Sequence, residues 1–192
     1  MNRQEALALL HKHTINVNLR RHCYAVEVVM KALASRLGES EKADIWGIAG
    51  LLHDADYESL KDTPEVKTEH TRKTIRWLKE LNAQVDIQDA IAAHAWGYVE
   101  GAPQPKSKME WALYTCDELT GLIVAVALVK PDRKLASVGV DSVMKKWKET
   151  SFASGVNRGQ IEKCKDYLDI PLQEFVRIAL NAMQSIAPEL GL

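Results

Sequence analysis

The chain has 192 residues, the length of one ordinary globular domain. Lysine and arginine total 25 and aspartate and glutamate total 26, and the resulting net charge of −1 argues against a dedicated nucleic-acid-binding protein and against a polybasic membrane anchor. Hydrophobic residues make up 46% of the chain and charged residues 27%, which excludes an intrinsically disordered protein.

Three widely spaced cysteines, Cys23, Cys116 and Cys164, form no CxxC pair, so neither a disulfide framework nor a thiolate zinc site is predicted. The N-terminus lacks an apolar signal core. The longest apolar run, Leu122 to Val129, is about a third of the ~20 residues that a membrane-spanning helix needs. We therefore expect a cytoplasmic protein that binds neither membranes nor nucleic acid.

Helices are predicted along nearly the whole chain, because apolar residues recur three and four positions apart and no segment shows sustained period-2 alternation. The expected helices are residues 2–13, 17–37, a helix from Ser40 up to a loop at 55–66, 67–81, 86–96, 107–129, 140–149, 158–168 and 171–187. Asn157 with Gln160 resembles a capping box, and Pro171 suits the first turn of the last helix. The predicted fold class is all-α.

Six polar residues lie on the apolar faces of five of these helices. At about 100° per residue, His22 points into the stripe of Leu19 and Val26, and the other five face inward in the same way. An inward histidine taken alone is an ordinary core residue, but a buried carboxylate is costly unless it is paired or bound to metal. Convergence on one metal centre would satisfy the whole set, and imidazole with carboxylate suits Mn, Fe, Co, Ni or Zn. The candidate ligands are His22, His53, Asp54, His70, His94 and Asp117.

In this order, these residues resemble the HD-domain superfamily of metal-dependent phosphohydrolases, over about residues 15–130. The segments Leu51–Glu58 and Glu69–Thr71, together with the tail of the chain, are similar to the corresponding segments of a bacterial subgroup of predicted HD-superfamily hydrolases. The resemblance implies one HD-type helical bundle over residues 1–192, with a metal-binding core at about 15–130 and additional C-terminal helices over about 131–192.

The resemblance also implies one or two divalent metal ions. In the family, positions matching His22, His53, Asp54 and Asp117 hold one ion, and members with histidines matching His70 and His94 often hold a second ion bridged by the Asp54 equivalent. The alternative is that these two histidines contact the phosphate of the substrate.

The implied function is hydrolysis of a nucleotide or other small phosphate ester by metal-activated water. We assign Asp54 as the catalytic residue, and Arg21, Lys61 and Arg72 are candidate contacts to the substrate phosphate. Four tryptophans are interpreted as packing residues, with a nucleobase pocket as the alternative; they are Trp46, Trp77, Trp96 and Trp111.

One stretch departs from the family pattern. Many HD proteins follow the His-Asp pair with a Gly-Lys that touches the substrate phosphate, whereas this chain has Ala55, Asp56 and Tyr57, with Lys61 as the nearest replacement. Two other functions stay open. One is a di-iron oxygenase of the inositol-oxygenase-like HD type, which has the same ligand order but generally carries the Gly-Lys. The other is a non-catalytic, metal-containing binding module.

Overall fold

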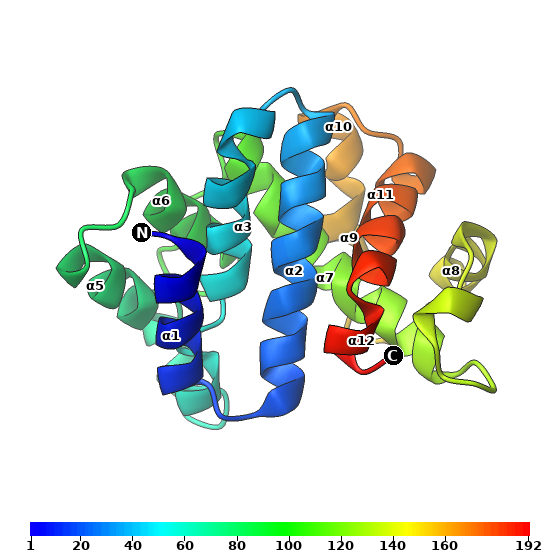
Figure 1. The fold of residues 1–192 in the computed structure, drawn as a ribbon, viewed down its shortest axis with the longest axis horizontal. Helices are drawn as coiled ribbons and strands as arrows, with labels where there is room; N and C mark the ends of the chain where they lie inside the picture. Colours follow the sequence, from blue (N-terminus) through cyan, green and yellow to red (C-terminus); the bar gives the residue numbers. More distant parts are fainter.

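The computed structural model describes residues 1–192 and contains helices and no strand (Figure 1), which confirms the all-α prediction. The α-helices are α1 (Arg3–His13), α2 (Val17–Arg36), α3 (Ala43–Leu52), α4 (Val66–Glu69), α5 (Arg72–Glu80), α6 (Val85–His94), α7 (Lys108–Leu128), α8 (Val140–Trp147), α9 (Arg158–Glu162), α10 (Cys164–Leu168), α11 (Leu172–Ser185) and α12 (Ala187–Leu190). Short 3-10 turns lie at Ser40–Lys42, Tyr57–Ser59 and Leu135–Ser137.

Two of the predicted helices are interrupted. The helix expected over 67–81 breaks at His70 and Thr71, where Thr71 has a left-handed φ of 68°. The break is stabilised by buried Asp56, whose carboxylate accepts a hydrogen bond from the backbone N–H of Thr74 at 3.0 Å. Apolar periodicity does not reveal a contact made by a residue in a distant turn, so the prediction of one helix was wrong here. The helix expected over 158–168 likewise divides into α9 and α10 at Lys163.

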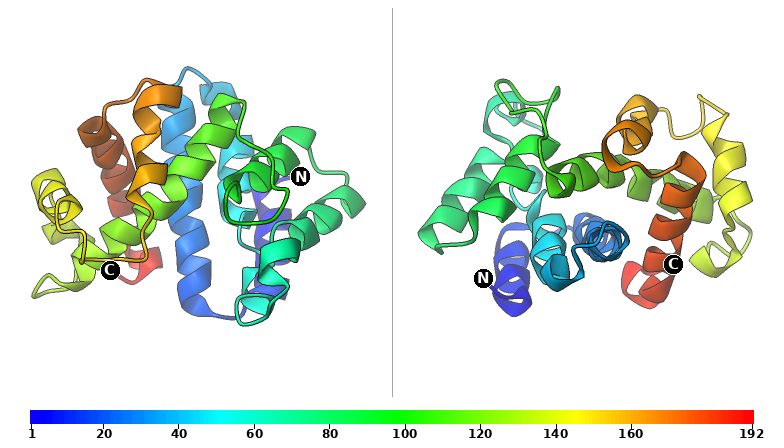
Figure 2. Two further views of the ribbon diagram at one scale, coloured as in Figure 1. Left: turned by 180° about the vertical axis from the view of Figure 1, so that it is seen from behind. Right: turned by 90° about the horizontal axis from the view of Figure 1, so that it is seen from above.

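The long helix α7 lies at the centre of the arrangement. The two further views show it crossing between α5 and α6 on one side and the C-terminal helices on the other (Figure 2). It is long and apolar enough to cross a membrane by composition, but 67% of its most apolar window is buried inside the fold. This burial is what the core helix of a globular protein shows. Ser107 and Glu110 begin the helix with a reciprocal capping box.

Helices α2 and α3 lie side by side (Figure 1) and approach each other closely at Gly50. A Cβ atom at this position would lie 2.8 Å from the backbone carbonyl oxygen of Val26, closer than van der Waals contact allows. The missing side chain therefore sets the separation of the two helices. The same approach places the end of α3, where His53 follows, beside His22 on α2.

Replacing Gly50 with alanine is expected to lower the free energy of unfolding by about 1–3 kcal/mol, because the added methyl group meets a rigid backbone. The matched control is Gly47→Ala, where the added Cβ would meet only the flexible side chain of Lys31. The control should be neutral or slightly stabilising, since alanine favours a helix interior over glycine by about 1 kcal/mol. Urea denaturation of the two variants measures the difference, and equal stabilities would contradict the close-packing argument.

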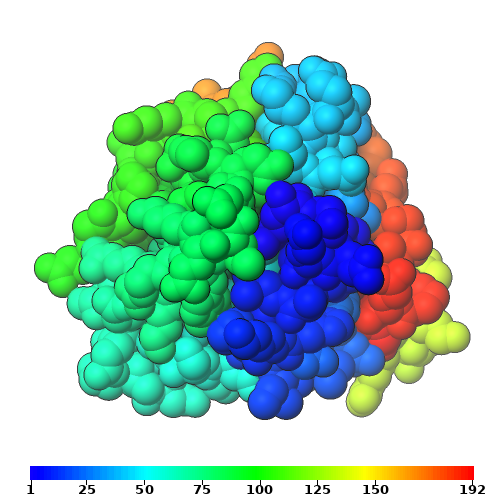
Figure 3. All heavy atoms as spheres, turned by 60° about the vertical axis from the view of Figure 1, so that its left-hand side comes forward, coloured from blue at the N-terminus to red at the C-terminus, as the bar shows by residue number.

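Both ends of the chain pack on this core. In α1, Arg3 forms two hydrogen bonds with the buried carboxylate of Glu27, at 2.5 and 2.9 Å. The space-filling view shows the N-terminal helix lying between the region around residues 60–95 and the C-terminal residues (Figure 3). Of the C-terminal helices, α11 and α12 pack on α2, and α9 packs on α7. The C-terminal extension therefore reaches the same helix that carries Asp117.

Candidate metal centre

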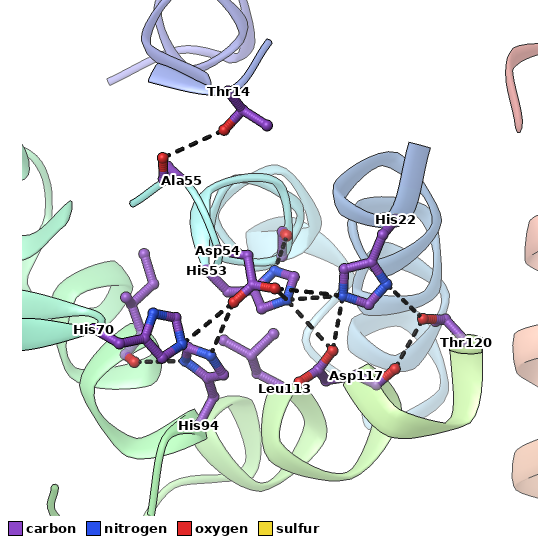
Figure 4. Close-up of polar contacts among 12 residues, drawn as sticks. Thr14, His22, His53, Asp54, Ala55, His70, His94, Leu113, Asp117 and Thr120 are labelled. Carbon is purple, nitrogen blue, oxygen red and sulfur yellow. Dashed lines mark hydrogen bonds and ion pairs between the residues drawn. The ribbon is translucent and has the colours of Figure 1, made fainter. Parts of the chain in front are cut away.

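The six candidate ligands meet at one point between the helices (Figure 4). Only two of them stand inside a long helix, and the other four lie at helix ends or in the turns that follow. The positions are His22 in α2, His53 and Asp54 directly after α3, His70 directly after α4, His94 as the last residue of α6, and Asp117 in α7. Helix ends bring side chains from separate elements to a common centre without a kink in any helix.

Asp54 lies in the middle of the cluster, with its two carboxylate oxygens facing different histidines (Figure 4). Its Oδ2 is 3.8 Å from Nε2 of His22 and 3.5 Å from Nε2 of His53. Its Oδ1 is 3.4 Å from Nε2 of His70 and 3.6 Å from Nε2 of His94. The ligands therefore form two groups that share one carboxylate.

Asp117 forms ion pairs with the histidines of only one of these groups. Its Oδ1 is 2.9 Å from Nε2 of His22 and 3.4 Å from Nε2 of His53. No ion pair joins it to the other two histidines. The first group is thus four residues, His22, His53, Asp54 and Asp117, and the second is His70 and His94 with Asp54.

The backbone fixes two of the imidazoles. Nδ1 of His53 lies 2.8 Å from the carbonyl oxygen of Gly50, and Nδ1 of His94 lies 2.7 Å from that of Ile91. Carbonyls in the last turn of a helix have no partner within the helix, so a histidine at the end satisfies one of them. Because a carbonyl only accepts, each Nδ1 donates its hydrogen, and each Nε2 is left as the ring nitrogen that faces the carboxylates.

Two residues that the sequence interpretation did not identify hold the other imidazoles. Buried Asp56 accepts from Nδ1 of His70 at 2.8 Å. The hydroxyl of Thr120 donates to the carbonyl of Asp117 at 2.8 Å, so its oxygen is free to accept from Nδ1 of His22 at 3.2 Å. A ligand histidine normally donates its second nitrogen to a carboxylate or other acceptor. That requirement could have singled out Asp56, which lies only two positions after Asp54.

The turn that carries Asp54 is tied to the N-terminal part of the chain. The hydroxyl of Thr14 donates to the carbonyl of Ala55 at 3.3 Å (Figure 4). The carboxylate of Glu58 accepts from the backbone N–H groups of Ile15 and Asn16, at 2.6 and 2.9 Å. These contacts fix the start of α2 against the turn after α3, and so fix His22 relative to His53 and Asp54.

The carboxylates control the protonation of the site. Although burial opposes a charged imidazole at His53, the nearby charges of Asp54 and Asp117 raise its pKa from the ordinary 6.5 to about 9. Burial likewise opposes the charged forms of both carboxyl groups, and the histidines outweigh it and lower the pKa of each. At His94, burial dominates and lowers the pKa. Without metal, His53 therefore carries a proton at neutral pH, next to the carboxylates of Asp54 and Asp117.

This protonation predicts a pH-dependent stability of the metal-free protein. The folded protein binds the proton on His53 more tightly than the unfolded chain does, so the stabilisation is complete below pH 6.5 and is lost as the pH rises to about 9. The shift corresponds to about 3 kcal/mol. We expect the urea midpoint of chelator-treated protein to fall over this range, and His53→Gln to remove most of the fall. An equally steep fall in the variant would contradict the assignment.

The donor set fits transition-metal ions. Four imidazoles and two carboxylates converge without thiolates. The donor atoms lie within 4.8 Å of one another in each of three sets, which are His22, His53 and Asp54; His53, His94 and Asp117; and Asp54, His70 and His94. Such ligands suit Mn, Fe, Co, Ni or Zn. The two groups around Asp54 offer places for two ions, with this carboxylate between them.

The three basic residues predicted to contact substrate lie elsewhere. Arg72 donates to the carbonyl of Glu100 at 2.8 Å, and the Lys61 ammonium lies 3.7 Å from Asp62. Arg21 packs against Gly191 and lines a second groove of about 450 Å³ beside the C-terminus, which the ligand His22 also lines. None of the three lines the cavity over the metal centre. Arg21 and His22 are neighbours in α2, where successive side chains diverge by about 100°, so Arg21 points away from the centre.

The metal centre opens into a cavity of about 550 Å³. Its far walls are formed by aromatic residues and by residues from the C-terminal extension, among them Trp96 and Gln160. Of the four tryptophans considered above, Trp96 lines this cavity, whereas Trp46 and Trp111 are buried in the core. The packing interpretation therefore holds for those two, and Trp96 fits the pocket alternative.

The fold and site define a class of protein: an all-α protein with a histidine–aspartate centre suited to divalent metal ions. The family model described as HD domain matches residues 19–127, and the chain belongs to this family. Its members are mostly metal-dependent phosphohydrolases, which suggests metal-dependent hydrolase activity. Comparisons with curated proteins and with solved structures gave no significant match.

Proposed function

We propose that the protein is a phosphohydrolase that uses two divalent metal ions to hydrolyse a nucleotide or other small phosphate ester in the cytoplasm. The observation that carries the proposal is the position of Asp54, whose two oxygens face separate groups of histidines. Two ions held by these groups would supply the charge stabilisation that in-line displacement at phosphorus needs. The substrate enters from the cavity above the centre, and neither nucleic acid nor a membrane takes part.

The reaction adds one water molecule across a phosphoester bond. The water oxygen bonds to phosphorus, the bond from phosphorus to the ester oxygen breaks, and the alcohol leaves with a proton as orthophosphate forms. Bound metal supplies Lewis acidity, which makes water nucleophilic near neutral pH and withdraws charge from phosphoryl oxygens.

The chain's own residues prepare the centre for this chemistry. Asp54 joins the two ligand groups and is the catalytic residue of the proposal. Asp56 and Thr120 hold the imidazoles of His70 and His22 so that each Nε2 faces inward. The imidazole of His53 is fully buried beneath the centre. The ligands are thus positioned before any substrate arrives, which limits the reorganisation needed during reaction.

Elemental analysis and a phosphate-release assay test the proposal together. Protein is prepared separately with Mn, Fe, Co, Ni and Zn and assayed on p-nitrophenyl phosphate and on natural monoesters. Two ions per chain with release of orthophosphate supports the proposal. Oxygen uptake by the iron form without phosphate release would instead favour the di-iron oxygenase, and full metal content without any turnover would favour a binding module.

A further inference from the structure

Four aromatic residues line the cavity beside the ligands. Trp96 and Tyr114 form one pair, with ring centroids 5.5 Å apart. Tyr57 and Tyr98 lie next to the ligand His70, with ring centroids 5.4 and 6.2 Å from that of the imidazole. A cavity lined by several aromatic rings favours a planar group over a flexible polar chain.

The C-terminal extension adds two amide side chains to this wall, both outside the region matched by the family model. Gln160 Nε2 donates to the carbonyl of Tyr114 at 2.6 Å, which leaves its Oε1 without a partner. Asn157 Oδ1 accepts from the backbone N–H of Gln160 at 3.1 Å, which leaves its Nδ2 without a partner. One acceptor and one donor are therefore available at the edge of the cavity, as recognition of a heterocycle requires.

This wall is rigidly held. Arg158 lies between the two amide residues in sequence, and its guanidinium donates to the carbonyls of Trp147, Glu149 and Phe152 at 3.0, 3.2 and 2.7 Å. The backbone N–H of Asn157 also donates to Glu118 on α7, at 3.1 Å. The extension is thus anchored both to its own preceding loop and to the helix that carries Asp117.

Apart from the ligand histidines, the cavity has no basic residue in its lining, neither lysine nor arginine. The nearest lysines contact aromatic rings without lining the cavity: Lys67 Nζ lies 3.8 Å from the centre of the Tyr98 ring, and Lys163 Nζ lies 5.7 Å from that of Trp96. A phosphoryl group at the metal centre has cations to neutralise it when metal is bound. A second or third phosphate extending into the cavity would have none.

Resting on the proposed phosphohydrolase function, we propose that the substrate is a monophosphate ester of an uncharged planar heterocycle, that is, a nucleoside monophosphate and not a di- or triphosphate. The ring lies against Trp96, and its polar edge bonds to Asn157 and Gln160 from the C-terminal extension. The C-terminal extension therefore determines specificity, while the matched family region supplies the metal centre.

The test compares AMP with ADP, ATP and glycerol 3-phosphate as substrates of the metal-loaded protein. AMP is expected to exceed glycerol 3-phosphate in kcat/KM by about tenfold or more, from base stacking. It is also expected to exceed ATP by about tenfold or more, because the added charges lack partners. Binding of adenosine to chelator-treated protein, followed by saturation-transfer NMR, gives a readout independent of turnover.

Two variants locate the specificity. Trp96→Leu and Gln160→Met should each lower the AMP to glycerol 3-phosphate ratio by about tenfold and weaken adenosine binding. Tyr167→Leu is the matched control, because Tyr167 is a half-exposed aromatic residue that stacks on Trp111 outside the cavity. Thermal melting confirms that each variant is folded. If Trp96→Leu fails to fold, Gln160→Met provides the test.

The outcomes separate this inference from the proposed function. Equal kcat/KM for glycerol 3-phosphate and AMP, or ATP as the better substrate, would overturn the inference and leave the phosphohydrolase intact. A further outcome is that adenosine binds to the wild type but not to Trp96→Leu while no ester is hydrolysed. That result would support the binding of a heterocycle beside Trp96 and overturn the proposed phosphohydrolase function. A reduced ratio in Tyr167→Leu equal to that in Trp96→Leu would also overturn the inference.

Discussion

Replacing Asp54 with alanine is expected to remove both metal ions and to slow phosphoester hydrolysis at least about a thousandfold. Both of its oxygens face ligand histidines, so neither ligand group stays complete without it. The loss of several kcal/mol of charge stabilisation accounts for a rate effect of this size. Elemental analysis after gel filtration gives the metal content, and orthophosphate release gives the rate.

The matched control is Asp62→Ala. Asp62 belongs to the loop that follows the same turn, and its side chain is 86% exposed. The Asp62→Ala variant should keep full metal content and full activity. A second readout is the rise in thermal stability on adding metal, which reaches about 2.7 kcal/mol when free metal is a hundredfold above the dissociation constant. Asp54→Ala should lose that rise. Two ions retained by Asp54→Ala would contradict the bridging arrangement.

Much of the fold was predictable because the helices obey local rules. The 3.6-residue repeat marks α2 and α7, and their observed bounds differ from the predicted ones by at most one residue at each end. The interruption at His70 was not predictable in this way, since it depends on a carboxylate fourteen positions away that reaches both His70 and Thr74. Apolar periodicity predicts where a helix lies in the sequence, whereas interruptions of the helix depend on tertiary contacts.

The inward direction of the candidate ligands could also be read from the sequence. Each of these six side chains points from an apolar face, and burial makes isolated polar groups there costly. The lining of the cavity could not be read in this way, because proximity in sequence to a ligand does not determine where a side chain points. Arg21 directly precedes His22 but packs against Gly191. The cavity walls come instead from residues far along the chain, such as Asn157, whose proximity depends on how the extension folds back over α7.

Two double variants are expected to divide the metal centre into its halves. His70→Ala with His94→Ala removes the imidazoles that face Asp54 Oδ1, and should leave one ion per chain in the group completed by His22. His22→Ala with Asp117→Ala impairs the opposite group, and should leave at most one ion in the other half. Each should slow hydrolysis by about a thousandfold, because in-line displacement loses one of its two charge-stabilising cations.

Elemental analysis counts the ions, and electron paramagnetic resonance of the Mn form shows whether they are close together. Two Mn ions about 3.5–4 Å apart couple magnetically, so both double variants should lose the coupled signal and show that of isolated Mn. The control is His13→Ala with His11→Ala, since these histidines lie in α1 and contact Trp77 and Tyr24 instead. If His70 and His94 contact substrate phosphate and not metal, their removal will leave the metal count and the magnetic signal unchanged while KM rises. That result would reduce the centre to a single ion held by His22, His53, Asp54 and Asp117.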